Sequence, residues 1–169
     1  MAGEGIQLYL VRHGVAAERG DAWPDDAKRP LTPQGLTRMR RIAQGLGALG
    51  TRFDLILSSP LVRARQTADA LVSLADGKAI VTLDALSPGG SPASVIGALA
   101  EHSRRHAIAL VGHEPNMGEL AARLLGLRTP PPFKKGAVCR IDVEALPPGR
   151  SARLVWFATP KMLRQIGKA

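Results

Sequence analysis

The chain has 169 residues, of which 45% are hydrophobic and 22% are charged. These values are ordinary for a globular protein, and the length predicts a single domain over residues 1–169. Lys and Arg number 23 against 14 Asp and Glu, and the net charge of +9 favours phosphorylated substrates, acidic proteins or nucleic acids as partners. Aromatic residues make up only 4%, which weakens binding by base stacking, so we expect no nucleic-acid partner.

The sequence also bears on the compartment. A single cysteine, Cys139, excludes an intramolecular disulfide, and a reducing compartment is the simplest assumption. No apolar run reaches the length needed to span a membrane. Residues 1–5 carry Glu4 and no basic stretch, unlike a secretory signal. We therefore expect a cytoplasmic protein with no membrane partner, and we expect it to be a monomer.

The first predicted strand covers about residues 6–12. Its apolar run is typical of a strand buried on both faces of a parallel sheet. A polar segment without a clear period, residues 15–30, follows as a loop. Thr32 then caps a helix with apolar residues at helical spacing. We expect Gly47 and Gly50 to mark the end of this helix.

Short apolar strands and helices then alternate. In chain order, we predict a strand at 54–60, a helix at 61–75, a strand at 79–83, a helix at 92–103, a strand at 107–111 and a helix at 116–125. Two further strand-like segments, 137–143 and 152–157, suggest a hairpin, and the basic tail, 160–169, suggests a short helix. This order predicts an α/β fold: a mainly parallel sheet with helices on both faces and an antiparallel C-terminal strand or hairpin.

Three predicted strands end in side chains that suit an anion. The first delivers Arg12 and His13, the second is followed one helical turn later by Arg63, and the fourth delivers His113. The carboxyl ends of parallel strands share one edge of a sheet, so these four side chains can meet in one crevice. Arg binds phosphate oxygens through paired, charge-assisted hydrogen bonds. The sequence therefore predicts a phosphate-binding pocket.

The same residues carry a resemblance to a known family. Val11-Arg12-His13-Gly14, residues 58–68 and Val111-Gly112-His113-Glu114-Pro115 resemble the three signature blocks of the histidine phosphatase superfamily, which has the phosphoglycerate mutase-like fold. The Arg29-Pro30-Leu31-Thr32 segment and the short length resemble its SixA-type branch, the bacterial phosphohistidine phosphatases.

This resemblance implies a two-step reaction. His13 is expected to be the nucleophile that forms a covalent phosphohistidine, which water then hydrolyses. Arg12, Arg63 and His113 are expected to hold the oxygens of the transferring phosphoryl group. We expect no metal and no cofactor. His102 and His106 have the i, i+4 spacing of a metal pair, but they lie at a predicted helix end and are interpreted as solvated.

One departure from the family pattern concerns the proton donor. Many superfamily members place a glutamate after the third strand, whereas here Asp84 is the only nearby carboxylate and becomes the candidate general acid. Glu18, Asp21 and Asp25 are weaker candidates. General acid catalysis contributes about 100-fold to 10,000-fold, so an acid-poor site favours a leaving group that needs little help. The imidazole of a phosphohistidine is such a group.

We therefore predict hydrolysis of phosphohistidine on a phosphotransfer-type protein. The chain has no room for long insertions, so the pocket should be open to a side chain on a protein surface, and the basic surface should favour an acidic partner. A phosphatase for small phosphomonoesters or nucleotides is the alternative. A non-catalytic module that binds phosphate or nucleic acid is the third hypothesis. His13 argues against it, because binding alone needs only Arg and backbone donors.

Overall fold

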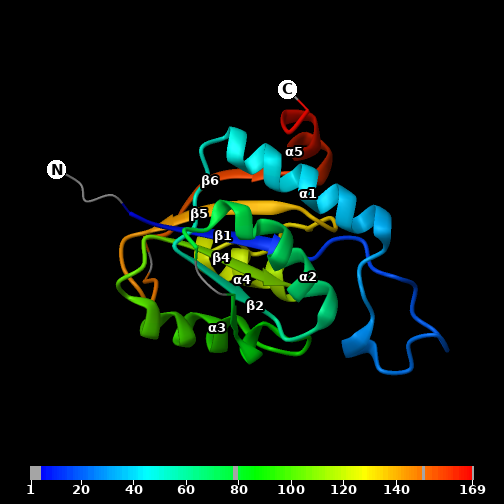
Figure 1. Cartoon of the computed structure of the whole chain (residues 1–169). Coiled ribbons are helices and arrows are strands. Elements are labelled where there is room, and N and C mark those ends of the chain that lie inside the picture. Colours follow the sequence, from blue (N-terminus) through cyan, green and yellow to red (C-terminus); the bar gives the residue numbers. More distant parts are fainter. Residues whose placement is uncertain (1–4, 78–79, 150, 169) are drawn as a thin grey trace.

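A six-stranded sheet in the order β3-β2-β4-β1-β5-β6 forms the centre of the computed structural model, which describes residues 5–77, 80–149 and 151–168 (Figure 1). Its strands are β1 (Ile6–Arg12), β2 (Leu55–Ser58), β3 (Val81–Thr82), β4 (Ala107–Gly112), β5 (Val138–Val143) and β6 (Arg153–Ala158). Strands β1 to β4 run parallel, whereas β5 pairs antiparallel with both β1 and β6. The predicted fold class is confirmed.

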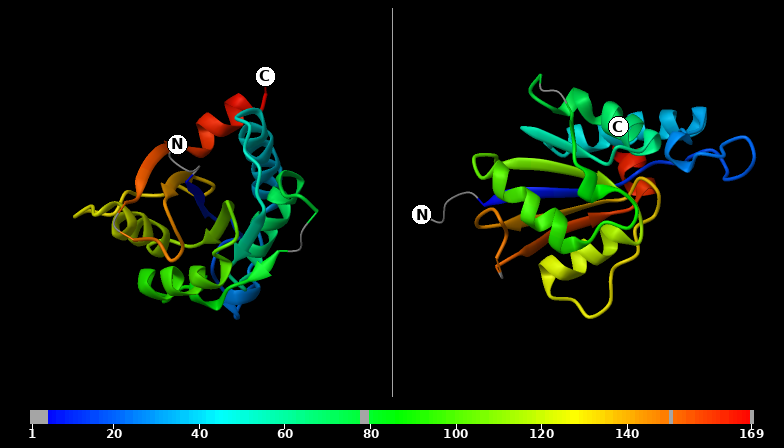
Figure 2. Two further views of the ribbon diagram at one scale, coloured as in Figure 1. Left: turned by 90° about the vertical axis from the view of Figure 1, so that its left-hand side faces the viewer. Right: turned by 90° about the horizontal axis from the view of Figure 1, so that it is seen from below.

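Helices cover both faces of this sheet, as the two views of Figure 2 show. They are α1 (Pro33–Ala48), α2 (Val62–Leu71), α3 (Pro92–Ala98), α4 (Asn116–Leu125) and α5 (Pro160–Ile166). Apolar side chains of α1, α2 and α5 share one core cluster, and those of α3 and α4 share the other. None of the described helices is both long and apolar enough to cross a membrane.

Strand β1 lies between these two core clusters. Its side chains alternate between the two faces of the sheet, so successive residues join opposite clusters. Leu8 and Leu10 belong to the α3–α4 core, whereas Tyr9 and Val11 belong to the α1–α2–α5 core. All four are at most 2% exposed. Burial of an apolar side chain contributes roughly 1.5–3 kcal/mol, so both layers of helices hold this strand in place.

Local capping explains where α1 begins. The Thr32 side chain accepts a hydrogen bond from the Gly35 N–H at 2.9 Å, and Pro33 occupies the first turn, as predicted. The Thr32 N–H also donates to the Val15 carbonyl at 3.0 Å. The start of the helix is thereby joined to the start of the polar loop that follows β1.

Several predicted boundaries were wrong by a few residues. The predicted helix at 61–75 ends as α2 at Leu71 and continues as one 3₁₀ turn, and the helix at 92–103 ends as α3 at Ala98 before a similar turn. The predicted strand at 79–83 shortens to β3, an exposed edge strand with few partners. Ala79, residues 1–4 and the last residue of the tail lie outside the described residues, so the predictions made for them are not examined by the structure.

Candidate active site

The two histidines meet because their strands are neighbours. In the parallel pairing of β1 with β4, Arg12 lies opposite Gly112, so His13 and His113 follow at the same level. The His13 N–H donates to the Gly112 carbonyl at 3.0 Å. The two imidazole rings lie with their centroids 5.1 Å apart and their planes inclined by 56°.

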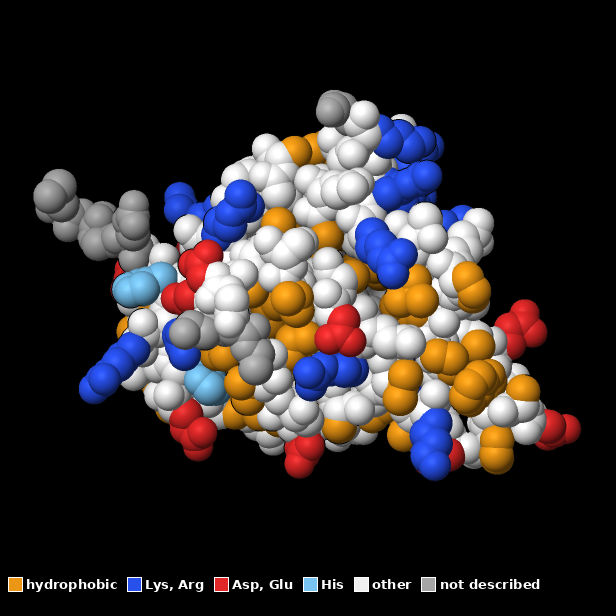
Figure 3. Space-filling view, in the orientation of Figure 1, with side chains coloured by type: hydrophobic (Ala, Val, Ile, Leu, Met, Phe, Trp, Pro, Cys, Tyr) orange, Lys and Arg blue, Asp and Glu red, His pale blue; other side chains and the backbone are white. Residues whose placement is uncertain are grey.

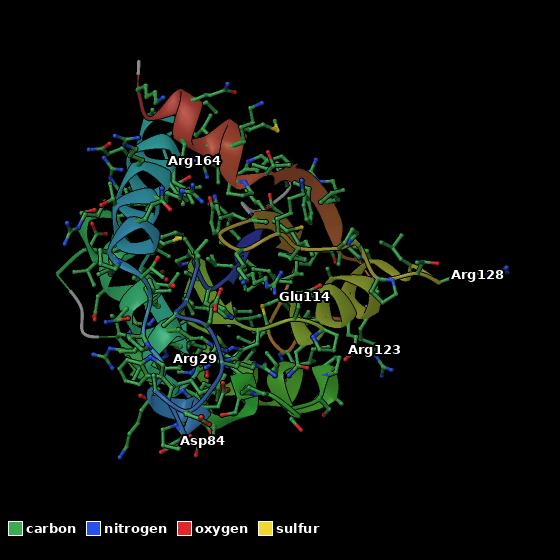
Figure 4. The ribbon with its side chains drawn as sticks, turned by 90° about the vertical axis from the view of Figure 1, so that its right-hand side faces the viewer. Arg29, Asp84, Glu114, Arg123, Arg128 and Arg164 are labelled. Carbon is green, nitrogen blue, oxygen red and sulfur yellow. The ribbon has the colours of Figure 1, made fainter. Side chains whose placement is uncertain are left out.

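Arg63 reaches the same place from the first turn of α2, which follows β2 on the other side of β4. Its side chain is 2% exposed. The four predicted site residues line one cavity of about 370 Å³, together with loop residues 16–19, Arg29, Pro88, Glu114 and Lys135. Figure 4 views this end of the molecule, with Arg29 and Glu114 labelled. The structure therefore brings Arg12, His13, Arg63 and His113 together.

His13 is held in one tautomer. Its Nδ1 lies 2.7 Å from the Gly14 carbonyl oxygen, which can only accept, so we assign the ring proton to Nδ1 and the free lone pair to Nε2. The Gly14 N–H donates to Thr67 Oγ1 at 3.0 Å, and the Thr67 hydroxyl donates to the Arg63 carbonyl at 2.8 Å. These bonds join Gly14, the residue after His13, to the helix that carries Arg63.

Burial lowers the pKa of His13 to about 3. The hydrogen bond to Gly14 opposes this shift, whereas His113, Arg63 and Arg12 lower the pKa further by charge repulsion. The ring is therefore neutral near pH 7, and a neutral imidazole with a free Nε2 lone pair is the form that can attack phosphorus.

His113 is neutral for similar reasons: burial and then Arg63 lower its pKa to about 4, against the opposing charge of Asp26. Its Nε2 lies 2.8 Å from Ser59 Oγ, which also accepts from the Leu61 N–H at 3.3 Å. We assign the Ser59 hydroxyl as donor to Nε2, which places the His113 proton on Nδ1. His113 then presents an N–H donor without carrying a charge.

Each arginine is fixed at one end by oxygen acceptors. Arg12 Nη1 donates to the Phe133 carbonyl at 2.7 Å, and the Phe133 N–H donates to Glu114 Oε2 at 3.3 Å. Arg63 Nη1 donates to the Asp26 backbone carbonyl at 2.9 Å, and Nη2 donates to Asp26 Oδ2 at 3.0 Å. Burial lowers the pKa of both guanidinium groups, and the charges of Glu114 and Asp26 respectively oppose that effect.

Three buried side-chain nitrogens in the described part of the chain have no hydrogen-bond partner within the protein: Arg12 Nε, Arg63 Nε and His113 Nδ1. Buried polar atoms are bonded in the large majority of cases, so each exception calls for an explanation. All three exceptions belong to residues that line the same cavity as His13. With the tautomer assigned above, they are three N–H donors on residues that share a cavity with His13, a set that matches in number the three oxygens of a phosphoryl group.

The candidate proton donors occupy different places. Asp84 begins a 3₁₀ helix, Asp84–Leu86, is exposed, and is not among the residues that line the cavity. Its label lies well away from that of Glu114 in Figure 4. Glu114 and Glu18 do line the cavity, but both Glu114 oxygens already accept backbone N–H bonds, one of them from Gly118 at 2.7 Å. The acid role of Asp84 stays a prediction, and its position does not favour it.

Sequence reasoning missed the anchoring residues around the site. Asp26 contacts Arg63 across 37 positions, and Arg29 is 7% exposed and donates to Asp26 and to the Ala17 carbonyl. The one sequence signal for these residues was the Arg29-Pro30-Leu31-Thr32 block. It contributed to the SixA-type resemblance, but no structural role was assigned to Arg29. The described residues contain no group of three or more His, Cys, Asp or Glu placed to hold a metal ion.

Comparison with known proteins identifies the class. A sequence model of the histidine phosphatase superfamily (branch 1) matches residues 8–87, which include Arg12, His13 and Arg63. An uncharacterized protein of Picosynechococcus is 42% identical over 118 residues, which are 69% of this chain and 71% of that protein. The chain belongs to the histidine phosphatase superfamily, and its class of activity is that of a phosphatase.

Within this superfamily the chain is similar to SixA proteins, as its motifs indicated. The phosphohistidine phosphatase SixA of Escherichia coli is 29% identical over 143 residues, or 82% of this chain and 86% of that protein. The structure of the protein histidine phosphatase SixA complexed with tungstate matches with a TM-score of 0.81 and 26% identity, covering 92% of this chain and 98% of that one.

Proposed function

We propose that the protein hydrolyses phosphohistidine on a partner protein through a covalent intermediate at His13. The observation that carries the proposal is the set of three unpartnered donors, Arg12 Nε, Arg63 Nε and His113 Nδ1, around the cavity that His13 lines. A related SixA structure contains tungstate, a tetrahedral oxyanion with the shape of phosphate, which supports an oxyanion site here.

The first step transfers the phosphoryl group to the protein. The lone pair of His13 Nε2 forms a bond to phosphorus while the bond between phosphorus and the substrate imidazole breaks, and the leaving imidazole takes a proton from water. The two arginines and His113 stabilise the charge that spreads over the phosphoryl oxygens. In the second step a water oxygen attacks phosphorus, the bond to Nε2 breaks, and phosphate leaves with His13 neutral again.

The leaving group favours phosphohistidine over an alkyl ester. Imidazole leaves as a neutral base after taking one proton, whereas an alkoxide needs a strong general acid. In the cavity, both oxygens of Glu114 are already occupied as acceptors of backbone hydrogen bonds from Gly118 and Phe133. The similarity to the E. coli phosphohistidine phosphatase points to the same substrate class.

The test is phosphate release from a histidine-containing phosphotransfer domain that has been phosphorylated with phosphoramidate. The wild-type protein should release phosphate much faster from this domain than from an aryl or alkyl phosphate at equal concentration. His13→Ala should abolish turnover, and mass spectrometry of the wild-type protein quenched during turnover at neutral pH should locate phosphate on His13. A preference for the small esters would favour the small-molecule alternative, and turnover by His13→Ala would remove the mechanism.

We also propose that residues 1–169 form one cytoplasmic domain that acts as a monomer. Arg12, His13, Arg63 and His113 line one cavity within one copy of the chain, which supports a monomer. Size-exclusion chromatography with light scattering tests this, because a stable dimer would contradict the proposal.

A further inference from the structure

A second hollow, of about 230 Å³, lies beside the catalytic cavity, between α1, α5 and the segment before β5. We call it the cationic groove, and its charged lining residues are Arg38, Lys134, Lys135, Lys161 and Arg164. Met39, Ile42 and Pro160 add apolar lining between them. Figure 3 shows Lys and Arg side chains gathered over α1 and α5 at the upper right.

The charges in this groove are not neutralised by the protein itself. The groove lining contains no Asp or Glu, and within residues 5–77, 80–149 and 151–168 none of its five cations forms an ion pair. Arg29 and Arg63, by contrast, both pair with Asp26. Five like charges around one hollow repel each other, and such a concentration of charge attracts an anionic partner.

The groove adjoins the active site. Lys135 lines both hollows, and Gly14, the residue after the nucleophile His13, lines the groove. Figure 4 shows Arg164 and Glu114 on the same end of the molecule. A partner that inserts one side chain into the catalytic cavity therefore lays its neighbouring surface against the groove.

We propose that the cationic groove binds carboxylate side chains of an acidic segment next to the phosphohistidine of the protein substrate. This inference rests on the proposed function and names the chemistry of its partner. Glutamate fits the lining on two counts, because its carboxylate meets the Lys and Arg heads while its aliphatic stem meets the part-exposed Val15 and Pro160. The lining has no aromatic residue on which a nucleic-acid base would stack.

The experiment uses two synthetic peptides of equal length, each with one histidine phosphorylated by phosphoramidate. One carries glutamates on both sides of the histidine, and the other carries glutamines. At low salt the wild-type kcat/KM should be about tenfold higher on the glutamate peptide, as expected for a few exposed ion pairs acting together. This preference should shrink as salt screens the charges. In Arg38→Gln/Lys161→Gln, which removes two of the five cations, the ratio should fall to about threefold or less.

A matched control removes two charges elsewhere. Arg40 lies on the same helix as Arg38, and Arg104 lies in the turn before β4; both are exposed, and neither lines the groove. Arg40→Gln/Arg104→Gln should keep the tenfold preference. Loss of the preference in this control, or its survival in the groove variant, would overturn the proposal, because net charge or another surface would then be responsible.

Binding of the unphosphorylated peptides, followed by fluorescence anisotropy, separates this proposal from the proposed function. Suppose that neither phosphopeptide is hydrolysed, but the glutamate peptide still binds more tightly and loses this advantage in Arg38→Gln/Lys161→Gln. The groove proposal would then be supported, and the proposed phosphohistidine phosphatase activity would be refuted. If phosphopeptides are hydrolysed with no preference, the groove proposal falls alone. A single-stranded oligonucleotide that displaces the glutamate peptide and binds more tightly through the same two residues would make nucleic acid the occupant and overturn the proposal.

Discussion

Arg63 depends on Asp26 for its orientation, and Asp26→Asn isolates that dependence. Two guanidinium nitrogens of Arg63 are bonded to Asp26, one through the backbone carbonyl and one through Oδ2, which leaves Nε without a protein partner. The substitution keeps the hydrogen bond to the backbone carbonyl and replaces the carboxylate by an amide of similar shape. It therefore removes the negative charge that pairs with Arg63 and Arg29.

The expected loss of activity in Asp26→Asn depends on how far the Asp26 side chain is exposed to water. A hydrogen bond to a charged group contributes about 1.5–3 kcal/mol. The Asp26 side chain is 45% exposed, so water screens the pair and takes over part of the bonding. We expect a loss of about 1–1.5 kcal/mol in transition-state stabilisation, which is roughly a tenfold fall in kcat/KM. Inhibition by vanadate, an oxyanion that we expect to bind at the same site, should weaken in parallel.

The assay compares Asp26→Asn with Asp21→Asn, an exposed loop carboxylate without an ion pair in the described structure. Asp21→Asn should retain wild-type kcat/KM. A double-mutant cycle then tests the route of the effect, because Asp26→Asn should cost little once Arg63→Ala has removed its partner. Equal losses in the two backgrounds, or an unchanged kcat/KM in Asp26→Asn alone, would refute a positioning role for Asp26.

Further predictions concern protonation and the proton donor. Because the pKa of His13 is about 3 and not 6.5, kcat/KM corrected for substrate ionisation should stay level from pH 7 to about 5; a fall centred near 6.5 would contradict the neutral buried imidazole. The unfolded chain binds protons at His13 and His113 below about pH 6.5 while the folded chain does not, so these two histidines should lower the thermal midpoint as the pH falls from 6.5 towards 4. Ser59→Ala removes the partner of His113 Nε2 and should lower kcat by about 3- to 10-fold. If this variant kept the wild-type kcat, the tautomer assigned to His113 would be excluded. Asp84→Asn should change kcat by less than about twofold on phosphohistidine, and a loss in the range of general acid catalysis would restore Asp84 as the donor. Activity should also survive EDTA, and a loss that added metal reverses would show a metal requirement.

The parts of the site that could be predicted follow from short-range patterns. The apolar run of β1 ends at Arg12, and the same pattern recurs before His113, so the alternation of strands and helices was enough to place both histidines at one sheet edge. Arg63 follows β2 by one helical turn and could be placed in the same way. Because the strands are parallel, their carboxyl ends lie at one edge of the sheet, and the residues that follow them come together there.

The parts that could not be predicted depend on contacts between distant segments. The loop of residues 15–30 has no hydrophobic period, so nothing in it indicated that Asp26 would bond to Arg63 or that Arg29 would be buried. Glu114 sits in a recognised motif, but its hydrogen bond to the Phe133 N–H joins two segments 19 positions apart. Helix ends were misplaced for a different reason, because α2 and α3 continue after Leu71 and Ala98 as short 3₁₀ turns and not as α-helix.

The position of β1 has a consequence for how the protein loses activity. This strand lies inside the sheet between β4 and β5, with a core cluster on each side, and His13 follows its last residue. Backbone amides in such a strand exchange with solvent only when the whole domain opens, whereas loops and chain ends open at much lower cost. Fraying at the periphery therefore leaves His13 in place, and the position of this imidazole is lost only when the whole fold denatures.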